Sequence, residues 1–337
     1  MSDDADALLA RAAEAGIHRL DLPTPFAVGR VNTYLIEDDP LTLVDAGPNS
    51  GKALDELEQK LAARGHRIED LELLVITHQH MDHLGLTGIL QRRSGAEVAA
   101  YESLVEWAPN FRDSMEAEDA YAEELMARHG TPEELRLALR AVASGFRGWG
   151  GAVTITRPLR AGTTLDLRDR TLEISHRPGH SPSDTIFHDR ERKILLSADH
   201  LIQRISSIAL LTPEPEDLRP AERPRPLVRY MDSLRQTRDM TDVELVLTGH
   251  GDPVTEPVEL IDGRFVMYAK RADKFHGMLV KHGPQSAYEI AQRTWGNVAV
   301  TQAFLTLSEV LGHMDLLLDA GRVVEADDGQ VIRYRAV

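Results

Sequence analysis

A cluster of potential metal ligands follows directly on an apolar run. The run Leu71 to Ile76 predicts a buried strand, and the H-x-H-x-D-H motif behind it consists of His78, His80, Asp82 and His83. The carboxyl edge of an α/β sheet is where ligands usually bind. With 14 His in 337 residues, three His and one Asp would occupy these four positions by chance in roughly one chain in several hundred. The sequence therefore predicts a metal-binding loop at the end of a strand.

The same arrangement, a buried strand followed by a ligand-capable side chain, recurs at three later points. These are Thr171 to His176 before His180, Lys193 to Ser197 before Asp199, and Leu245 to Leu247 before His250. Taken singly, a loop histidine is more often solvated or structural than a metal ligand. Taken with the H-x-H-x-D-H motif, the three positions indicate one shared metal centre.

Asp45 follows another short apolar strand, just before the turn at Gly47 and Pro48. Aspartate is a common turn former, which is one interpretation of this position. Beside a metal loop, its carboxylate is also well placed to orient a ligand histidine.

Composition limits both the metal and the partners. Because the chain contains no Cys, imidazole and carboxylate groups alone must hold the metal, which narrows the candidates to zinc, iron and manganese. A formal net charge of −16 repels nucleic acid and anionic membranes. The chain begins with acidic residues where a secretory signal needs basic ones, and no apolar run reaches membrane-spanning length. We therefore expect a cytoplasmic protein without a membrane partner.

The predicted elements divide the chain into two domains. Residues 16–262 alternate strands and helices, including a strand over Val153 to Ile155, and form the expected catalytic domain. Within it, residues 102–150 hold two amphipathic helices, the first from Glu116, and act either as a lid or as an ordinary helical hairpin. Residues 263–337 follow the order helix, helix, helix, hairpin, which is that of a winged helix.

The third helix of this C-terminal domain does not suit DNA binding. It offers Glu309, Asp315 and Asp319 and no Lys or Arg before Arg322, so phosphates would repel it. We expect this domain to serve in packing, in closing the substrate pocket or in dimerisation. A homodimer is therefore one of the expected assemblies.

Together the motifs resemble the five successive motifs of the metallo-β-lactamase fold superfamily, in the family's order over roughly residues 16 to 255. With the trailing winged-helix-like domain, the chain most resembles the lactamase-beta-like-protein-2 and glyoxalase II-like branches. The resemblance implies an α/β fold. Its core would be an αββα sandwich of two mixed β-sheets with metals at one edge, followed by a small winged-helix-like α+β domain.

The resemblance also implies a division of the ligands between two Zn²⁺ ions, with iron or manganese as alternatives. One ion would take His78, His80 and His180, the other Asp82, His83 and His250, and Asp199 would bridge both. Two such ions ~3.5 to 4 Å apart share a water whose pKa falls from ~15.7 towards ~7. Asp82 would accept the proton of the resulting hydroxide.

Two residues discriminate among the activities of the family. His80 stands where the flavodiiron oxidoreductases carry a glutamate, and Asp199 is an aspartate that true metallo-β-lactamases lack. The glutathione-binding helical tail of glyoxalase II is not recognisable. We therefore expect a dinuclear zinc hydrolase whose metal-bridging hydroxide attacks an ester-like acyl bond of a small-molecule substrate, a thioester before other esters.

Two other functions stay open. A phosphodiesterase or endoribonuclease would direct the same hydroxide at phosphorus and would need a basic groove. The chain has a local group of arginines, which we interpret as a solvated loop and helix face: Arg219, Arg223, Arg225 and Arg229. The second alternative is a winged-helix regulator whose metal-bound domain acts as a sensor.

Overall fold

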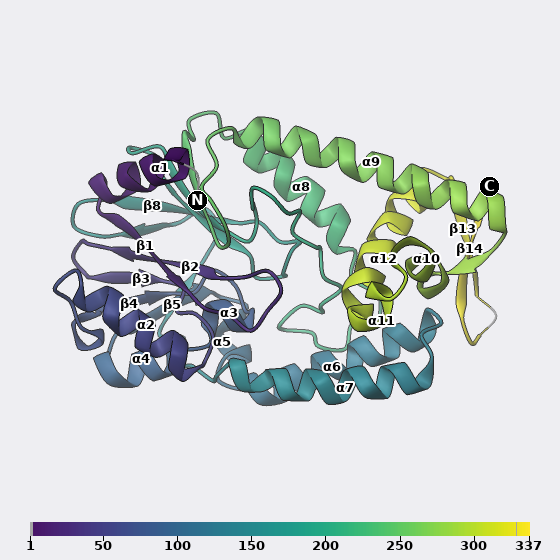
Figure 1. Cartoon of the computed structure of the whole chain (residues 1–337), viewed down its shortest axis with the longest axis horizontal. Coiled ribbons are helices and arrows are strands. Elements are labelled where there is room, and N and C mark those ends of the chain that lie inside the picture. The colour runs from purple at the N-terminus through teal and green to yellow at the C-terminus, as the bar shows by residue number, and fades with distance from the viewer. Residues whose placement is uncertain (1–2, 328) are drawn as a thin grey trace.

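Two mixed β-sheets, stacked face to face, form one end of the molecule (Figure 1). The computed structural model describes residues 3–327 and 329–337. The first sheet contains, in spatial order, β1 (Ile17–Leu22), β2 (Val31–Ile36), β3 (Thr42–Val44), β4 (Leu73–Val75), β5 (Glu97–Tyr101) and β6 (Arg157–Leu159). The second contains β11 (Leu245–Thr248), β10 (Ile194–Ala198), β9 (Thr185–Asp189), β8 (Thr171–His176) and β7 (Thr164–Asp166).

Apolar side chains from both sheets fill the layer between them. Tyr34 and Val75 of the first sheet share one buried cluster with Phe187 and Leu247 of the second. Because strand side chains alternate between the two faces of a sheet, the outer faces carry a second set of apolar residues that must also be covered.

Helices cover both outer faces of the stack. Over the first sheet lie α2 (Gly51–Ala62), α3 (Met81–Leu84), α4 (Thr87–Ser94) and α5 (Leu104–Trp107), and over the second lie α8 (Pro226–Arg238) and the first part of α9 (Pro257–His282). Two further helical elements, α1 (Asp3–Glu14) and η1 (Ile68–Asp70), pack against β1 and α4 respectively. The predicted αββα sandwich is confirmed.

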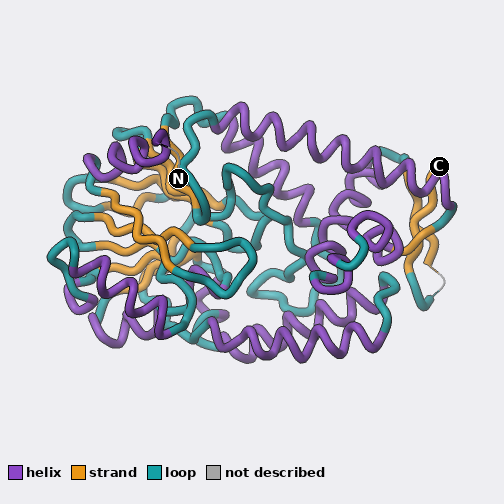
Figure 2. Tube along the Cα trace, viewed as in Figure 1, coloured by secondary structure: helices purple, strands orange, loops and turns teal. Residues whose placement is uncertain are grey.

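The position of the site follows from the pairs of parallel strands. Strands β3, β4 and β5 run parallel in the first sheet, as do β10 and β11 in the second. Their carboxyl ends meet at one edge of the stack, where strands (orange in Figure 2) give way to loops near the middle of the molecule.

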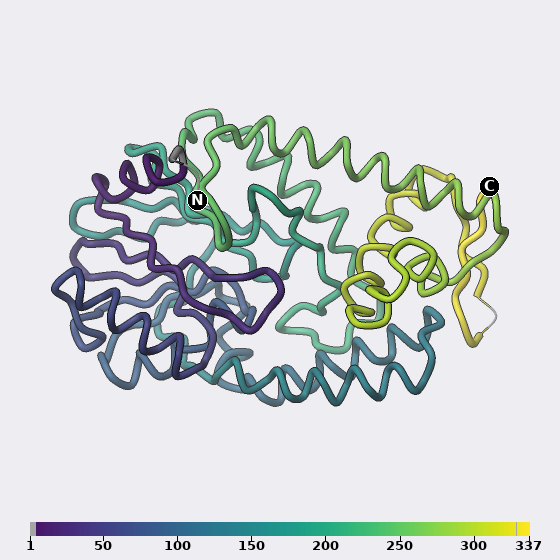
Figure 3. The backbone as a smooth tube through the Cα atoms, in the orientation of Figure 1, coloured from purple at the N-terminus to yellow at the C-terminus, as the bar shows by residue number. Residues whose placement is uncertain are grey.

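The segment 102–150 is helical, as predicted. It contains α6 (Phe111–Arg128), α7 (Glu133–Phe146) and the short η2 (Arg147–Trp149). Helix α6 begins earlier than the predicted Glu116, and Arg147 pairs with its Asp119 at 2.6 Å. Figure 3 shows the two helices running side by side from the sandwich towards the C-terminal region.

Nearby, one strand prediction is wrong and another strand was missed. The strand predicted over Val153 to Ile155 is wrong, because these residues form no strand and the ladder begins at Arg157. Val153 and Ile155 are buried by packing against the helices outside the first sheet, which mimics the alternation of a strand. Strand β9 was not predicted, since His188 and Asp189 interrupt its apolar pattern, yet all its residues are buried.

The C-terminal region consists of helices and a small three-stranded sheet. Its elements after α9 are β12 (Gln285–Ser286), α10 (Ala287–Trp295), α11 (Val298–Thr301), α12 (Ala303–Asp319), β13 (Val323–Asp327) and β14 (Ile332–Ala336). The sheet order is β12-β14-β13. The predicted domain boundary at 262–263 falls inside α9, so a continuous helix joins the two parts of the chain. That this region is a winged helix stays a prediction.

Helix α12 is largely buried between the sandwich and the rest of the C-terminal region. It packs against α8, α9 and α10, and a Cβ at its Gly312 would lie 2.7 Å from the Cβ of Leu227 on α8. Its buried Asp315 binds Arg223 through both carboxylate oxygens. The interpretation of Arg223 as a solvated loop residue is therefore wrong, because its side chain is only 19% exposed and forms a partly buried ion pair with Asp315.

None of the helices in residues 3–327 and 329–337 combines the length and apolarity needed to span a lipid bilayer.

Candidate metal centre

The H-x-H-x-D-H motif forms the loop after β4 and the first turn of α3. His80 has an extended backbone directly before this helix, and its carbonyl accepts the amide hydrogen of His83. Because Asp82 and His83 lie in a helical turn, their side chains leave the backbone in directions different from those of His78 and His80. One motif therefore supplies two groups of ligands.

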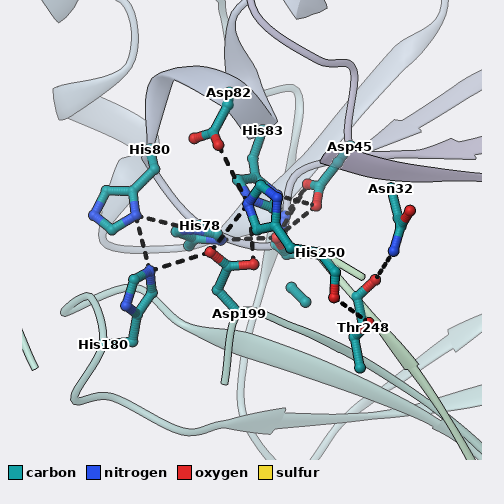
Figure 4. Close-up of polar contacts among 12 residues, drawn as sticks. Asn32, Asp45, His78, His80, Asp82, His83, His180, Asp199, Thr248 and His250 are labelled. Carbon is teal, nitrogen blue, oxygen red and sulfur yellow. Dashed lines mark hydrogen bonds and ion pairs between the residues drawn. The ribbon is translucent and has the colours of Figure 1, made fainter. Parts of the chain in front are cut away.

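The first triad, His78, His80 and His180, brings three imidazole nitrogens together (Figure 4). His80 Nδ1 lies 3.0 Å from both His78 Nε2 and His180 Nε2. Burial and the nearby His83 and His80 hold the pKa of His78 well below its ordinary value. Burial and His180 lower the pKa of His80 to about 3. These two rings are neutral at physiological pH, which is the form that binds metal.

The second triad consists of Asp82, His83 and His250. Asp82 Oδ2 lies 3.3 Å from His250 Nε2. Burial opposes charge on His83, but the carboxylates of Asp199, Asp45 and Asp82 outweigh it and hold its pKa well above the ordinary value. The second triad is thus rich in negative charge, and a cation could satisfy it in place of protons.

Asp199 lies between the two triads. Its Oδ1 is 3.5 Å from His83 Nε2, and its Oδ2 is 3.5 Å from both His180 Nε2 and His250 Nε2. Burial opposes its ionisation, yet His250 and His83 hold its pKa well below the ordinary range. A Cβ at Gly249 would lie 2.1 Å from Asp199 Oδ1, so only glycine leaves room for this carboxylate.

The side-chain atoms that face the middle of the cluster are suited to bind divalent cations. In the described part of the chain, the buried His83 Nε2 and Asp199 Oδ1 have no hydrogen-bond partner, which is costly unless something else binds them. Zinc binds imidazole at 2.0–2.1 Å, which places tetrahedral ligand nitrogens roughly 3.3 Å apart. The nitrogen separations of 3.0 Å in the first triad are close to that value.

The outward ring nitrogens of three histidines are held by oxygen atoms. His83 Nδ1 lies 2.7 Å from Asp45 Oδ2, His180 Nδ1 lies 3.0 Å from the carbonyl of Ile208, and His250 Nδ1 lies 2.8 Å from the carbonyl of Arg30. Donation from Nδ1–H to these acceptors leaves the Nε2 lone pair directed at the centre.

His78 is held through a hydroxyl. Thr77 Oγ1 lies 2.8 Å from Asp45 Oδ2 and 3.0 Å from His78 Nδ1. With its hydrogen donated to Asp45, the hydroxyl oxygen accepts from His78 Nδ1–H. Asp45 adopts a φ of +59°, which is rare for a residue with a side chain, and it also accepts from the Thr77 amide. Both interpretations of Asp45, as a turn residue and as an orienting carboxylate, are compatible with this geometry.

The structure brings every predicted site residue to this one edge: Asp45, His78, His80, Asp82, His83, His180, Asp199 and His250. Sequence reasoning did not find Thr77 or the carbonyls of Arg30 and Ile208. The position of Thr77 directly before the motif was a usable signal, but carbonyl acceptors carry no side-chain signal at all.

Comparison with known proteins agrees with this geometry. A family model described as the metallo-beta-lactamase superfamily matches residues 27–250. The probable metallo-hydrolase YqjP of Bacillus subtilis is 30% identical over 94% of this chain and 96% of its own length. The crystal structure of the metallo-beta-lactamase family protein TTHA1429 from Thermus thermophilus superposes with a TM-score of 0.77 at 25% identity, covering 96% of this chain and 99% of that one.

A shorter match concerns the acyl-coenzyme A thioesterase MBLAC2 of Bos taurus. The two proteins are 32% identical over 131 residues, which is 38% of this chain and 40% of that protein. The match therefore covers less than half of either protein.

Proposed function

The chain belongs to the metallo-beta-lactamase superfamily, and from this premise we propose that it is a dinuclear zinc hydrolase of ester-like acyl bonds, with thioesters as the favoured substrates. The observation that carries the proposal is the position of Asp199 within 3.5 Å of a histidine in each triad. A carboxylate in that place can serve two cations at once.

The ligands divide between two ions in this proposal. The first triad holds one ion, the second triad holds the other, and Asp199 contributes to both. When bound, such ions lower the pKa of water from ~15.7 towards ~7 and polarise a carbonyl oxygen of the substrate. Iron or manganese would suit the same nitrogen and oxygen ligands.

Asp82 is the proposed proton acceptor. Burial raises its pKa, but the neighbouring His83 and His250 outweigh burial, so the pKa lies below its ordinary value. The carboxylate is thus ionised at neutral pH. It can take a proton from the attacking water and return it to the departing thiolate or alkoxide.

Charge and similarity support a small acyl substrate over a nucleic acid. The chain carries a formal net charge of −16, and its arginine group is largely occupied by acids: Arg223 and Arg225 by Asp315, and Arg229 by Glu214. The partial similarity to an acyl-coenzyme A thioesterase favours a thioester. The burial of α12 also weakens the alternative of a DNA-binding regulator, since a recognition helix must reach the groove.

The proposal is tested on zinc-loaded protein with a panel of acyl-coenzyme A esters, glutathione thioesters, lactones and nitrocefin. We expect turnover of at least one thioester, its loss after chelation and its return with added zinc. The matched variant Asp82→Asn keeps the shape of the carboxylate and should lose most of the activity. Zinc-dependent cleavage of single-stranded RNA without thioester turnover would favour the phosphodiesterase instead, and no zinc-dependent turnover at all would refute the proposal.

A further inference from the structure

The segment 199–225 leads from the metal centre to α8 without forming a helix or a strand of either sheet. A loop of this length with no regular structure needs other contacts to fix its path. Its first part, residues 202–211, lies against α9 and α12, two helices of the C-terminal part of the chain.

Arg264 on α9 binds this segment at three points. Its Nη2 donates to the carbonyls of Ile202, Gln203 and Ile205 at 2.9, 3.2 and 2.7 Å. In the described part of the chain, the guanidinium hydrogen-bonds only to these carbonyls. Hydrogen bonds from a charged donor are about twice as strong as neutral ones, so Arg264 is the main clamp on this turn of the loop.

A second contact from α9 lies one helical turn further on. The hydroxyl of Tyr268, a residue that is 1% exposed, lies 2.9 Å from Ser206 Oγ. At the other end of the segment, the amide of Leu211 donates to Ser308 Oγ of α12 at 3.3 Å, and its side chain is buried in the C-terminal core. The segment is therefore held at both ends by residues far away in the sequence.

Between these two ends the segment contacts the metal centre. The carbonyl of Ile208 accepts from His180 Nδ1 at 3.0 Å, and the amide of Leu210 donates to the carbonyl of His180 at 3.4 Å. Ser207 Oγ donates to the carbonyl of Asp199. The direction of the His180 ring thus depends on a loop carbonyl whose own position depends on α9 and α12.

The two histidines of the second triad are oriented by groups outside this segment. Its His83 is oriented by Asp45, and its His250 by the carbonyl of Arg30 directly before β2. Asn32 on β2 further fixes the strand that leads to His250, since its Nδ2 donates to the carbonyl of Thr248 at 2.9 Å.

We propose that Arg264 and Tyr268 are positioning residues for the first triad: they hold residues 202–208 so that the Ile208 carbonyl aims His180 Nε2 at its metal ion. The inference rests on the proposed metal centre and gives the C-terminal helices a role within it. Loss of either side chain should weaken one of the two ions and spare the other.

The experiment titrates metal-free, full-length protein with Co²⁺ and follows stoichiometry by calorimetry and coordination by the visible spectrum. Wild type should bind two ions. Arg264→Ala should weaken one of them by up to about 10-fold and alter its spectrum, which is less than the loss of a contact made directly to a ligand. Tyr268→Phe should give a smaller effect in the same direction. Arg264→Lys keeps a charge with three donors and should restore part of the affinity.

The matched control is Arg271→Ala. Arg271 also lies on α9 and pairs with Glu309 of α12, but it makes no hydrogen bond or ion pair with residues 202–211, all of which the structure describes. This variant should bind both ions normally, and the melting temperature of the metal-free protein should change similarly in both alanine variants. Two ions bound with unchanged affinity in Arg264→Ala, or equal loss of both, would overturn the inference. Failure of the wild type to bind Co²⁺ would instead refute the proposed function.

Discussion

The two triads aim their imidazoles by different means. In the second triad, a buried carboxylate and a carbonyl next to a strand hold His83 and His250. In the first, His78 is held by a hydroxyl and His180 by a carbonyl of a loop without regular structure. The first triad consists of imidazoles alone, and the pKa values of His78 and His80 are lowered, whereas the second triad carries a carboxylate and the pKa of its His83 is raised.

This difference indicates that the second triad is built into the sandwich, while the first is completed from outside it. A site made of imidazoles alone also attracts a cation less strongly than one with a carboxylate. We therefore expect the first triad to bind the more weakly held ion and to respond more readily to changes in the C-terminal region.

The largest effect should come from a substitution that disturbs both triads at once. In Gly249→Ala, the new Cβ would lie 2.1 Å from Asp199 Oδ1 and 2.9 Å from His83 Cε1, so the shared carboxylate must move. We expect kcat/KM for the best thioester to fall by roughly 10²-fold or more, with weaker binding of both ions. Gly277→Ala is the control, since a Cβ there meets no atom within 4 Å. Normal activity in Gly249→Ala would show that Asp199 is not shared.

A change at Asp45 should act directly on the second triad and, through the hydroxyl of Thr77, more weakly on the first. Asp45→Asn removes the charge that faces His83 Nδ1, and we expect the affinity of that ion to fall roughly 10- to 100-fold. Metal titration of the purified variant measures this. The exposed pair of Asp262 with Arg238 supplies the control Asp262→Asn. If the affinities of both ions fall equally, the proposed difference between the two triads is wrong.

A smaller effect, confined to the first triad, should follow Thr77→Val. The substitution keeps the shape but removes the hydroxyl that links His78 Nδ1 to Asp45. We expect roughly fivefold weaker binding of one ion, equivalent to about 1 kcal/mol. Thr87→Val is a close control, because the hydroxyl of Thr87 is also buried but has no hydrogen-bond partner among the described residues. Equal metal affinities of Thr77→Val and Thr87→Val would contradict this prediction.

The smallest effect concerns pH and should leave both triads unchanged. Burial raises the pKa of Glu118, which accepts from Trp107 Nε1, from 4.5 to about 8. Between these values the folded state retains a proton that the unfolded state has lost, so stability falls as pH rises from about 4.5 to about 8. Glu118→Gln removes this loss. Its melting temperature should exceed that of wild type at pH 8 by roughly a few degrees and match it near pH 4.5, with metal stoichiometry unaltered.

The sequence predicted the side chains of the centre better than their support. His78, His80, Asp82 and His83 could be found because a short motif follows a continuous apolar strand, and both signals are local. The contact of the Ile208 carbonyl with His180 could not be predicted, because it depends on the path of a loop and on a backbone oxygen that every residue carries. Similarly, Arg223 and Asp315 are far apart in the chain, and nothing local distinguishes a partly buried pair from two surface charges.

The contacts of Arg264 also bear on the order in which the protein matures. A chain is synthesised from its N-terminus, and its domains generally fold as they emerge. The ligands of the second triad and their supports all lie within the first 250 residues, whereas the loop that aims His180 is held by Arg264, Tyr268 and Ser308. During synthesis, the second triad can therefore be complete while the first still awaits the helices that hold its loop.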